Sequence, residues 1–410
     1  MRILVISQYF YPEQFRINDI VEELVNRGHQ VTVVTGLPNY PEGNIYIGYE
    51  NAYKDVSDFH GATIYRCELR PRKKGKKNLA FNYLSFVIQA RKVLKSISPE
   101  FDVIYVYEPS PVTVALPAIW YKKKYGLPIF FYCMDQWPES VLGNGVKKNG
   151  LIYLVAKILS KYIYNSVDII GNKCKEFSDY IHSVCGIDYE KMCVLYEHAE
   201  NSYLSINENP IDNGIIDFMF LGNIGTAQNC GMLVEAFSKI DYKNRAKLHF
   251  VGDGSYMSEL NRVVYEQKLE NDVIFHGKHP IEEINSFYEL ADVCLLSLKG
   301  DNACGITPPG KLYGYLAASR TIIAAINGST EKIINESKSG YVVKDNDVDG
   351  LAKAMQEAIN APQKLSEFGR NGRKYFLDNY TLEKHISVLE KYLYSLAEKG
   401  NYKSGVREGI

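Results

Sequence analysis

The chain has 410 residues, of which 46% are hydrophobic and 23% are charged, as is usual for a soluble globular protein. This length allows roughly two to three domains, each large enough to bury its own core. The net charge of −1 argues against general nucleic-acid binding, yet the charge is unevenly distributed. Residues 1–200 carry 24 Lys and Arg against 21 Asp and Glu, whereas residues 201–410 carry 23 against 27.

The first half of the chain alternates short apolar segments with longer amphipathic ones, which predicts strands that alternate with helices. The expected strands are Ile3–Ile6, Val31–Thr35, Thr63–Arg66, Val103–Val106, Ile129–Tyr132, Ile169–Gly171 and Cys193–Tyr196. The expected helices are Asp19–Arg27, Asn78–Ile97, Val112–Tyr125, Leu151–Tyr164 and Lys173–Val184.

The second half resumes the alternation after a polar, Asn-rich stretch from Glu200 to Asp217, which we interpret as an interdomain linker. Its expected strands are Phe218–Leu221, Lys247–Val251, Val273–His276, Val293–Leu296, Thr321–Ala325 and Tyr341–Val343. The last apolar stripe, Leu382–Glu398, predicts a helix long enough to return to the first domain. Together these elements predict an α/β fold with two doubly wound, Rossmann-like sheets and a ligand cleft between their carboxyl ends.

Glycines follow the first strand of the second half. The strand Phe218–Leu221 runs into a turn with Gly222 and Gly225, and a helix is expected next. Glycine lets a backbone approach a ligand closely, and the first amides of a helix attract an anion, so the arrangement suits a diphosphate that is held by the amides of Gly222–Gly225. A tight strand-to-helix connection in any α/β domain explains the same residues equally well.

A second segment, Gly305–Tyr315, turns from a loop into a helix. We expect Thr307 as the N-cap and Pro308 as the first helical residue. Lys311 then lies in the first turn, where the helix dipole disfavours a cation unless an anion also binds there. We therefore favour a phosphate contact by Lys311, with the amides of Gly310 and Lys311, over a solvated surface lysine.

Taken together, the segments Gly222–Gln228 and Pro309–Ala317 resemble the retaining glycosyltransferases of family 4, which have the two-domain GT-B fold. Four segments of the first half are similar to the fucosaminyltransferase-like branch of bacterial surface-polysaccharide assembly: Gln8–Glu13, Phe15–Ile20, Gly36–Gly43 and Asp135–Ser140. The resemblance implies an acceptor-binding domain at 1–200, a nucleotide-sugar-binding domain at 201–381, and a C-terminal helix and tail at 382–410.

The resemblance also implies a set of donor-binding residues: Arg16, Gly222, Asn223, Gly225, Gln228, Gly252, Thr307, Gly310, Lys311 and Glu331. The chain departs from the family at four positions. Family members have an Arg and a Lys where this chain has Asn223 and Gln228, and glutamates where it has Ile306 and Gly314. The usual positive pair and ribose contact are therefore missing, which leaves Lys311 as the main visible positive charge for a diphosphate.

Two residues of the first half are further candidates. Asp135 follows the strand Ile129–Tyr132 and matches a family position near the donor sugar and the acceptor. A carboxylate there binds a sugar hydroxyl or helps to take the acceptor proton, so Asp135 and Lys311 are the expected catalytic residues; a capping Asp is an equally good interpretation. Arg16, where relatives have a glycine-rich loop, either supplies part of the missing charge or is a surface arginine.

Six cations occur within eight residues before the expected helix Asn78–Ile97: Arg70, Arg72, Lys73, Lys74, Lys76 and Lys77. A solvated turn is the ordinary interpretation of such a run. Because the helix carries aromatic and aliphatic residues, we favour binding to an anionic membrane surface, where each cation contributes roughly 1 kcal/mol. No base-stacking signal accompanies the run, so we expect no nucleic-acid partner.

The eight cysteines show no Cys-x-x-Cys pair and no ligand spacing with histidines, which predicts reduced, buried thiols and no metal site. The run Asp345–Asp347 follows a strand and precedes a helix, so we interpret it as turn and capping residues. We expect neither a secretory signal nor a bilayer-spanning segment. The expected location is therefore cytoplasmic, peripheral at the inner face of the plasma membrane.

The combined expectation is a retaining, metal-independent transferase that uses no cofactor. Its donor is a nucleotide-sugar, with UDP favoured over GDP and an N-acetylated or deoxy sugar among the candidates. The acceptor is a lipid-linked saccharide in capsule, O-antigen or other surface-polysaccharide synthesis. Two alternatives stay open: a nucleotide-sugar epimerase or hydrolase on the same fold, and a catalytically silent nucleotide-binding subunit of a polysaccharide-assembly complex.

Overall fold

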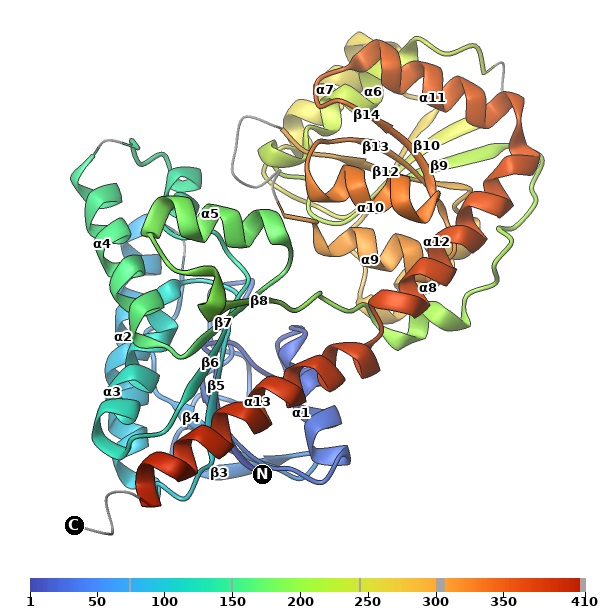
Figure 1. Ribbon diagram of the computed structural model, residues 1–410. Helices are drawn as coiled ribbons and strands as arrows, with labels where there is room; N and C mark the ends of the chain where they lie inside the picture. The colour runs from blue at the N-terminus through green and yellow to red at the C-terminus, as the bar shows by residue number, and fades with distance from the viewer. Residues whose placement is uncertain (74, 149, 243–244, 300–306, 406–410) are drawn as a thin grey trace. The chain divides into compact units, whose positions relative to one another are not determined.

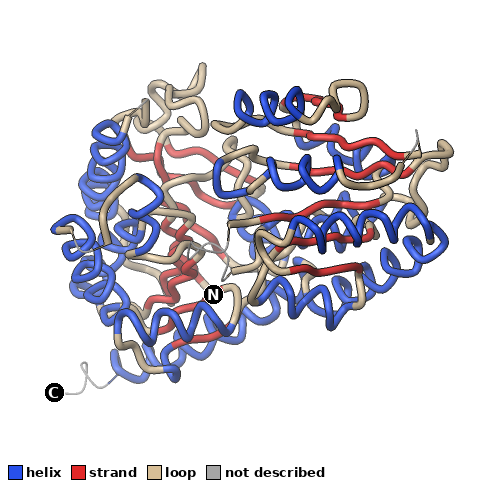
Figure 2. The backbone as a smooth tube through the Cα atoms, turned by 90° about the horizontal axis from the view of Figure 1, so that it is seen from above, coloured by secondary structure: helices blue, strands red, loops and turns tan. Residues whose placement is uncertain are grey.

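The computed structural model describes residues 1–73, 75–148, 150–242, 245–299 and 307–405 (Figure 1). The chain folds into two compact units. Unit 1 contains Met1–Leu195 together with the segment from Leu382 onward, and unit 2 contains Tyr196–Thr381. Each unit has one sheet with helices packed on both of its faces, as the tube view also shows (Figure 2).

The sheet of unit 1 has the strand order β3-β4-β2-β1-β5-β6-β7-β8. Every neighbouring pair is parallel except β3 and β4. The strands are β1 (Arg2–Ile6), β2 (Gln30–Gly36), β3 (Val56–Phe59), β4 (Ala62–Cys67), β5 (Val103–Glu108), β6 (Ile129–Cys133), β7 (Ile169–Asn172) and β8 (Met192–Val194). The order reverses between β1 and β5, which is where ligands bind in open α/β sheets.

Two layers of helices cover this sheet, because its strands alternate side chains between two faces. Leu4 and Ile6 of β1 belong to the core beneath one layer, whereas Ile3 and Val5 belong to the core beneath the other. The first layer contains α2 (Lys76–Ser96), α3 (Ala115–Tyr125), α4 (Leu151–Ser166) and α5 (Lys175–Cys185). The second layer contains α1 (Ile17–Asn26) and α13 (Leu382–Gly405).

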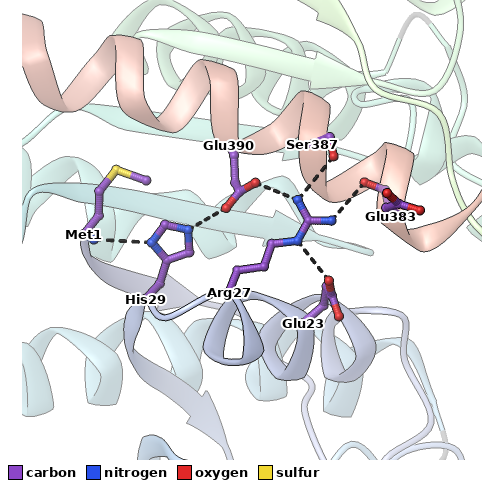
Figure 3. A network of polar contacts seen from close by, with 7 residues as sticks. All are labelled: Met1, Glu23, Arg27, His29, Glu383, Ser387 and Glu390. Atoms are coloured by element: carbon purple, nitrogen blue, oxygen red, sulfur yellow. Dashed lines mark hydrogen bonds and ion pairs between the residues drawn. The ribbon is translucent and has the colours of Figure 1, made fainter.

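Polar contacts hold α13 on unit 1 beside its apolar stripe (Figure 3). Arg27 donates to Glu390 at 2.8 Å and to Ser387 at 3.2 Å. His29 contacts the other oxygen of Glu390 at 2.7 Å. Although burial raises the pKa of Glu390, the hydrogen bonds from His29 and Arg27 hold it below its ordinary value. The C-terminal helix is therefore part of unit 1.

Unit 2 has an entirely parallel six-stranded sheet in the order β11-β10-β9-β12-β13-β14. Its strands are β9 (Ile216–Leu221), β10 (Ala246–Val251), β11 (Val273–Gly277), β12 (Val293–Ser297), β13 (Thr321–Ala325) and β14 (Gly340–Val343). This is the order of a dinucleotide-binding Rossmann sheet, with the reversal between β9 and β12.

The helices of unit 2 divide into two layers as well. One layer contains α6 (Cys230–Ser238), α7 (Met257–Glu266) and α11 (Val348–Asn360). The other contains α8 (Ile284–Leu290), α9 (Gly310–Ala317), α10 (Ser329–Ser337) and α12 (Leu365–Asn379). The short 3-10 turns of the two units are η1 (Val112–Val114), η2 (Glu139–Asn144), η3 (Tyr189–Lys191), η4 (Asn201–Ser205), η5 (Thr226–Gln228), η6 (Ile281–Glu283) and η8 (Pro362–Lys364).

The predicted α/β fold with parallel sheets is confirmed, and one strand was not expected. β3 pairs antiparallel with β4 through a two-residue turn in which His60 has φ 51° and Gly61 has φ 91°. Positive φ at both central residues is the geometry of a tight hairpin turn. Most of β3 is exposed, so its sequence lacks the apolar pattern that identified the other strands.

Candidate functional site

Two glycine-rich loops meet at the carboxyl edge of the unit 2 sheet. Gly222 follows β9 with φ +125°, and Gly252 follows β10 with φ +135°. A Cβ atom on Gly252 would lie 2.0 Å from the carbonyl oxygen of Gly222, and one on Gly254 would lie 2.3 Å from the carbonyl oxygen of Ile224. Only glycine fits where two backbones approach so closely.

Lys311 places its ammonium group beside this junction. Its Nζ lies 3.6 Å from the centroid of the Phe220 ring and 3.3 Å from the position that a Cβ on Gly222 would take. The Nζ atom is buried, and among the described residues it has no hydrogen-bond partner. Burial lowers the pKa of Lys311 to about 7. An anion bound beside Nζ would favour the charged form of this amine.

The neighbouring amides are already engaged, contrary to expectation. The amide of Gly222 donates to the carbonyl of Val251 at 2.8 Å, and that of Gly225 donates to Oε1 of Gln228 at 3.1 Å. Free Gly222 and Gly225 amides were predicted from the local sequence, which does not show the partner strand β10. Gln228 closes the turn by itself, and Asn223 stays exposed beside it.

The start of α9 also differs from the prediction. The helix begins at Gly310 with Pro309 at the N-cap position, and no side chain caps it, so Thr307 is not the N-cap. The reason is that a residue before a proline is disfavoured in helical geometry, which excludes Pro308 from the helix. Gly310 and Lys311 are therefore the first two helical residues, whose amides have no partner within the helix. The carboxylate of Glu197 lies near, 3.7 Å from the Cβ position of Gly310.

Gly314 faces two buried tyrosines rather than open space. A Cβ atom there would lie 2.7 Å from the hydroxyl of Tyr288 and 3.3 Å from the ring of Tyr203. The glutamate that family members have at this position would not fit without rearrangement. Ile306, at the other glutamate position, lies outside the described residues. Glu331 is exposed in the first turn of α10, the helix that follows β13.

The carboxyl edge of the unit 1 sheet carries a pair of carboxyl groups. Glu108 ends β5, and Asp135 follows β6, the next strand in the sheet. The amide of Asp135 donates to Oε2 of Glu108 at 3.4 Å. Glu108 is fully buried, and burial together with the charge of Asp135 raises its pKa well above the ordinary value. Tyr83 of α2 lies close enough that both carboxylates add to the effect of burial in raising its pKa.

Glu108 was missed because it ends the apolar run of β5 and looks like the last residue of a strand. Glu13 was missed as well, although it joins two of the segments that carry the family resemblance. Its Oε1 accepts from the amides of Asn39 at 2.8 Å and Tyr40 at 2.7 Å, and its pKa is raised by burial to about 7. The segments Gln8–Glu13 and Gly36–Gly43 are therefore tied together at the same edge of the sheet.

Arg16 lies in unit 1, directly before α1, where its charge acts on Asp19. Most of the basic run precedes α2: Arg70 stacks on the ring of Phe81 with its Cζ 4.7 Å from the centroid, and Arg72 stacks on Tyr40 at 5.2 Å. Lys73, Lys76 and Lys77 are exposed, and Lys74 lies outside the described residues.

Within the described ranges, no group of three or more His, Cys, Asp or Glu residues has the arrangement of a metal site. Seven of the cysteines are buried free thiols, and Cys304 lies outside those ranges. Asp347 caps α11 by accepting from the amide of Gly350 at 2.8 Å, as interpreted from its position. In the described part of the chain, no helix is both long and apolar enough to cross a bilayer.

Comparisons with known proteins agree with this architecture. The family model Glycosyltransferase Family 4 matches residues 15–197, and the model Glycosyl transferases group 1 matches residues 204–375. The chain is 22% identical to the O-antigen chain mannosyltransferase C of Escherichia coli, over 97% of this chain and 99% of that protein.

Two other similarities are narrower or more distant. The GDP-mannose-dependent alpha-(1-6)-phosphatidylinositol monomannoside mannosyltransferase of Mycolicibacterium smegmatis is 29% identical, but the match spans 32% of this chain and only 35% of that relative. The structure of Anabaena HepE in complex with UDP superposes with a TM-score of 0.71 at 12% identity, covering 96% of this chain and 100% of that one.

The two family models match in the order of the two units, and each unit has the Rossmann-like topology that the GT-B fold requires. The chain therefore belongs to the family 4 glycosyltransferases of the GT-B fold.

Proposed function

We propose that this glycosyltransferase takes its sugar from a nucleotide-diphosphate donor held by unit 2. The observation that carries the proposal is the buried Nζ of Lys311, which lies without a described hydrogen-bond partner at the reversal point of the sheet. A diphosphate supplies the missing negative charge. As the bond to the sugar breaks, charge accumulates on the leaving diphosphate, and a fixed ammonium in a dry site stabilises it.

Other residues of the donor site are proposed from the family resemblance. Gly310 offers an amide at the start of α9, where the helix dipole also favours an anion. Glu331, Asn223, Gln228 and Thr307 are proposed to contact the sugar or nucleotide. Gly252 keeps the second loop close to Gly222, and Arg16 is proposed to add positive charge from unit 1.

UDP is the nucleotide that we propose, and the named relatives differ on this point. The Anabaena protein was solved with UDP, whereas the Mycolicibacterium enzyme is GDP-mannose-dependent by name. Neither is similar enough over its whole length to transfer its specificity. A panel that compares UDP with GDP therefore decides the base.

We propose that unit 1 binds the acceptor, a lipid-linked saccharide of surface-polysaccharide or glycolipid synthesis. The full-length similarity to an O-antigen chain mannosyltransferase supports this class of product. Asp135 is proposed to bind the attacking hydroxyl or to take its proton, at the sheet edge where Glu108 and Tyr83 also lie. Retention of configuration and a reaction without a metal ion are proposed from the family alone.

The proposed location is the inner face of the plasma membrane, reached without a spanning segment. The exposed cations at the start of α2 support attraction to anionic lipid. This location matches an acceptor that is itself anchored in the bilayer.

Calorimetry with UDP and GDP, followed by turnover of a nucleotide-sugar with a lipid-linked acceptor, tests the proposal. If the proposal is right, one of the two nucleotides binds and a longer saccharide is formed. Binding without turnover on any acceptor would instead favour a catalytically silent subunit. The packing of Gly314 against Tyr203 and Tyr288, in place of the family glutamate, is the observation in favour of that second candidate.

A further inference from the structure

Helix α4 of unit 1 has an outward face that is almost entirely apolar. Eight of its residues are exposed, and six of these are large and hydrophobic, with exposed fractions of 77% for Leu151, 64% for Ile152, 53% for Leu154, 54% for Val155, 62% for Ile158 and 43% for Tyr162. The opposite face is buried against the unit through Tyr153, Ala156 and Ile163. A surface helix normally turns its apolar face toward the core, so the outward apolar face of α4 is unusual.

Helix α2 of the same layer carries a second set of exposed apolar side chains. Phe81, Leu84 and Ile88 follow helical spacing, and each is about half exposed. α2 and α4 both pack against η1, and Nζ of Lys76 at the start of α2 lies 3.5 Å from the Cβ position of Gly145 in the loop before α4. The two helices lie in one layer of unit 1 (Figure 1). Together they contribute nine of the twenty large exposed hydrophobic side chains of the described chain.

The charges of this layer have a single sign on three of its four helices. α2, α3 and α4 contain ten Lys and Arg residues and no Asp or Glu. Within the described part of the chain, Lys122 alone of these ten forms an ion pair, with Asp168 at 2.6 Å. On the opposite face of the same sheet, α1 and α13 together contain six acidic residues and four lysines. The layer that carries the apolar surface is therefore the more basic of the two layers of unit 1.

We infer that the outward face of α4, with Phe81, Leu84 and Ile88 of α2, is the surface that inserts into an anionic lipid bilayer. Apolar side chains bordered by cations fit the boundary between acyl chains and anionic headgroups. α4 has only 16 residues and two lysines, so it lies in the interface and does not span it. The inference rests on the proposed attachment to a membrane, and it adds an apolar anchor, mainly on α4, to the basic run before α2.

A second copy of the chain is the competing occupant of this surface. The charge pattern argues against it, because α2, α3 and α4 contain ten cations and no acidic residue, so the same helices of a second copy would offer no opposite charge. An anionic bilayer has the opposite charge and requires no such compensation.

The chain offers a matched pair of variants for the test. Val155 on α4 and Val56 on the edge strand β3 are 54% and 56% exposed, and both are in unit 1. Val155→Glu places a carboxylate in the proposed insertion surface, whereas Val56→Glu makes the same change elsewhere. Both proteins and the wild type are sedimented with vesicles of phosphatidylglycerol and phosphatidylcholine, and with vesicles of phosphatidylcholine alone. Their UDP binding and their oligomeric state are measured in parallel.

We expect the wild type and Val56→Glu to bind the anionic vesicles equally, and Val155→Glu to bind them at least tenfold more weakly. Unchanged UDP binding by Val155→Glu would show that unit 2 is intact. A loss of vesicle binding could then be distinguished from a failure of the donor site. Equal sedimentation of the two variants would overturn the inference. It would also be overturned if Val155→Glu converted a dimer to a monomer without weakening vesicle binding.

Discussion

The carboxyl edges of the two sheets carry opposite chemistry. In unit 1, Glu108 ends β5, Asp135 follows the adjacent strand β6, and the amide of Asp135 donates to the carboxyl group of Glu108. In unit 2, the ammonium of Lys311 lies beside Gly222 with no described hydrogen-bond partner. Burial raises the pKa of Glu108 and lowers that of Lys311, so each buried group favours its neutral form. The difference supports the proposed division of labour, in which unit 2 binds the anionic donor and unit 1 binds the hydroxyl groups of a sugar.

Removing the charge of Lys311 tests the unit 2 half of this comparison and has the largest expected effect. Lys311→Met keeps the length of the side chain but cannot stabilise a leaving diphosphate. We expect kcat/KM to fall at least tenfold, or about 1.4 kcal/mol of transition-state stabilisation, in a steady-state assay. The exposed Lys353 of α11 supplies the control, because Lys353→Met removes a charge from the same unit and should leave kcat/KM unchanged. An active Lys311→Met enzyme would show that the lysine is structural.

Asp135→Asn tests the unit 1 half. The amide keeps the size of the side chain and can still hydrogen-bond, but it cannot accept the proton of the attacking hydroxyl. We expect kcat to fall about tenfold or more while the dissociation constant for UDP stays the same, because the nucleotide is proposed to bind to the other unit. Asp55→Asn, at an exposed position of unit 1, serves as the matched control. If kcat is unchanged in Asp135→Asn, Asp135 has only a capping role.

Of the three substitutions, Arg16→Ala has the smallest expected effect. It tests whether unit 1 also contributes a positive charge to donor binding. If Arg16 contributes charge to the donor, its loss raises the KM for the nucleotide-sugar severalfold, roughly 1 kcal/mol for one partly exposed charge. Arg27, which pairs with Glu390 on α13, shows what a purely structural arginine does. Arg27→Ala should lower the melting temperature without changing the KM. An unchanged donor KM in Arg16→Ala would remove Arg16 from the site.

The sequence indicated the fold well because the strands are buried and their apolar segments are regularly spaced. It also located Lys311 in the first turn of a helix. It was wrong on the Gly222 and Gly225 amides, because their acceptors, Val251 and the side chain of Gln228, depend on how β10 and the turn pack. Such contacts between distant segments are not visible in local patterns.

Two other features were hidden for different physical reasons. Glu108 looks like the end of an apolar strand until the sheet places it beside Asp135. For α4, the helix itself was expected, but its outward face was not recognised, because the apolar residues of a surface helix are normally expected to face the core. The sequence showed the cations at the start of α2, whereas the apolar surface beside them required the structure.

The pKa of Lys311 links nucleotide binding to protons. In the free protein the pKa is lowered to about 7, so above that pH the folded chain releases a proton that the unfolded chain keeps up to about 10.5. The unfolded state then binds more protons, and stability rises with pH through this window by up to about 1.4 kcal/mol per pH unit. A bound diphosphate would raise the pKa of Lys311 again, because a neighbouring negative charge favours the ammonium form.

Calorimetry of UDP binding at pH 8, in two buffers with different ionisation enthalpies, tests the central claim most directly. The account predicts that the wild type takes up close to one proton for each UDP bound, and that Lys311→Met binds UDP more weakly and takes up none. Tight UDP binding by the wild type without proton uptake, or an equal uptake by Lys311→Met, would contradict the assignment of Lys311 to the diphosphate.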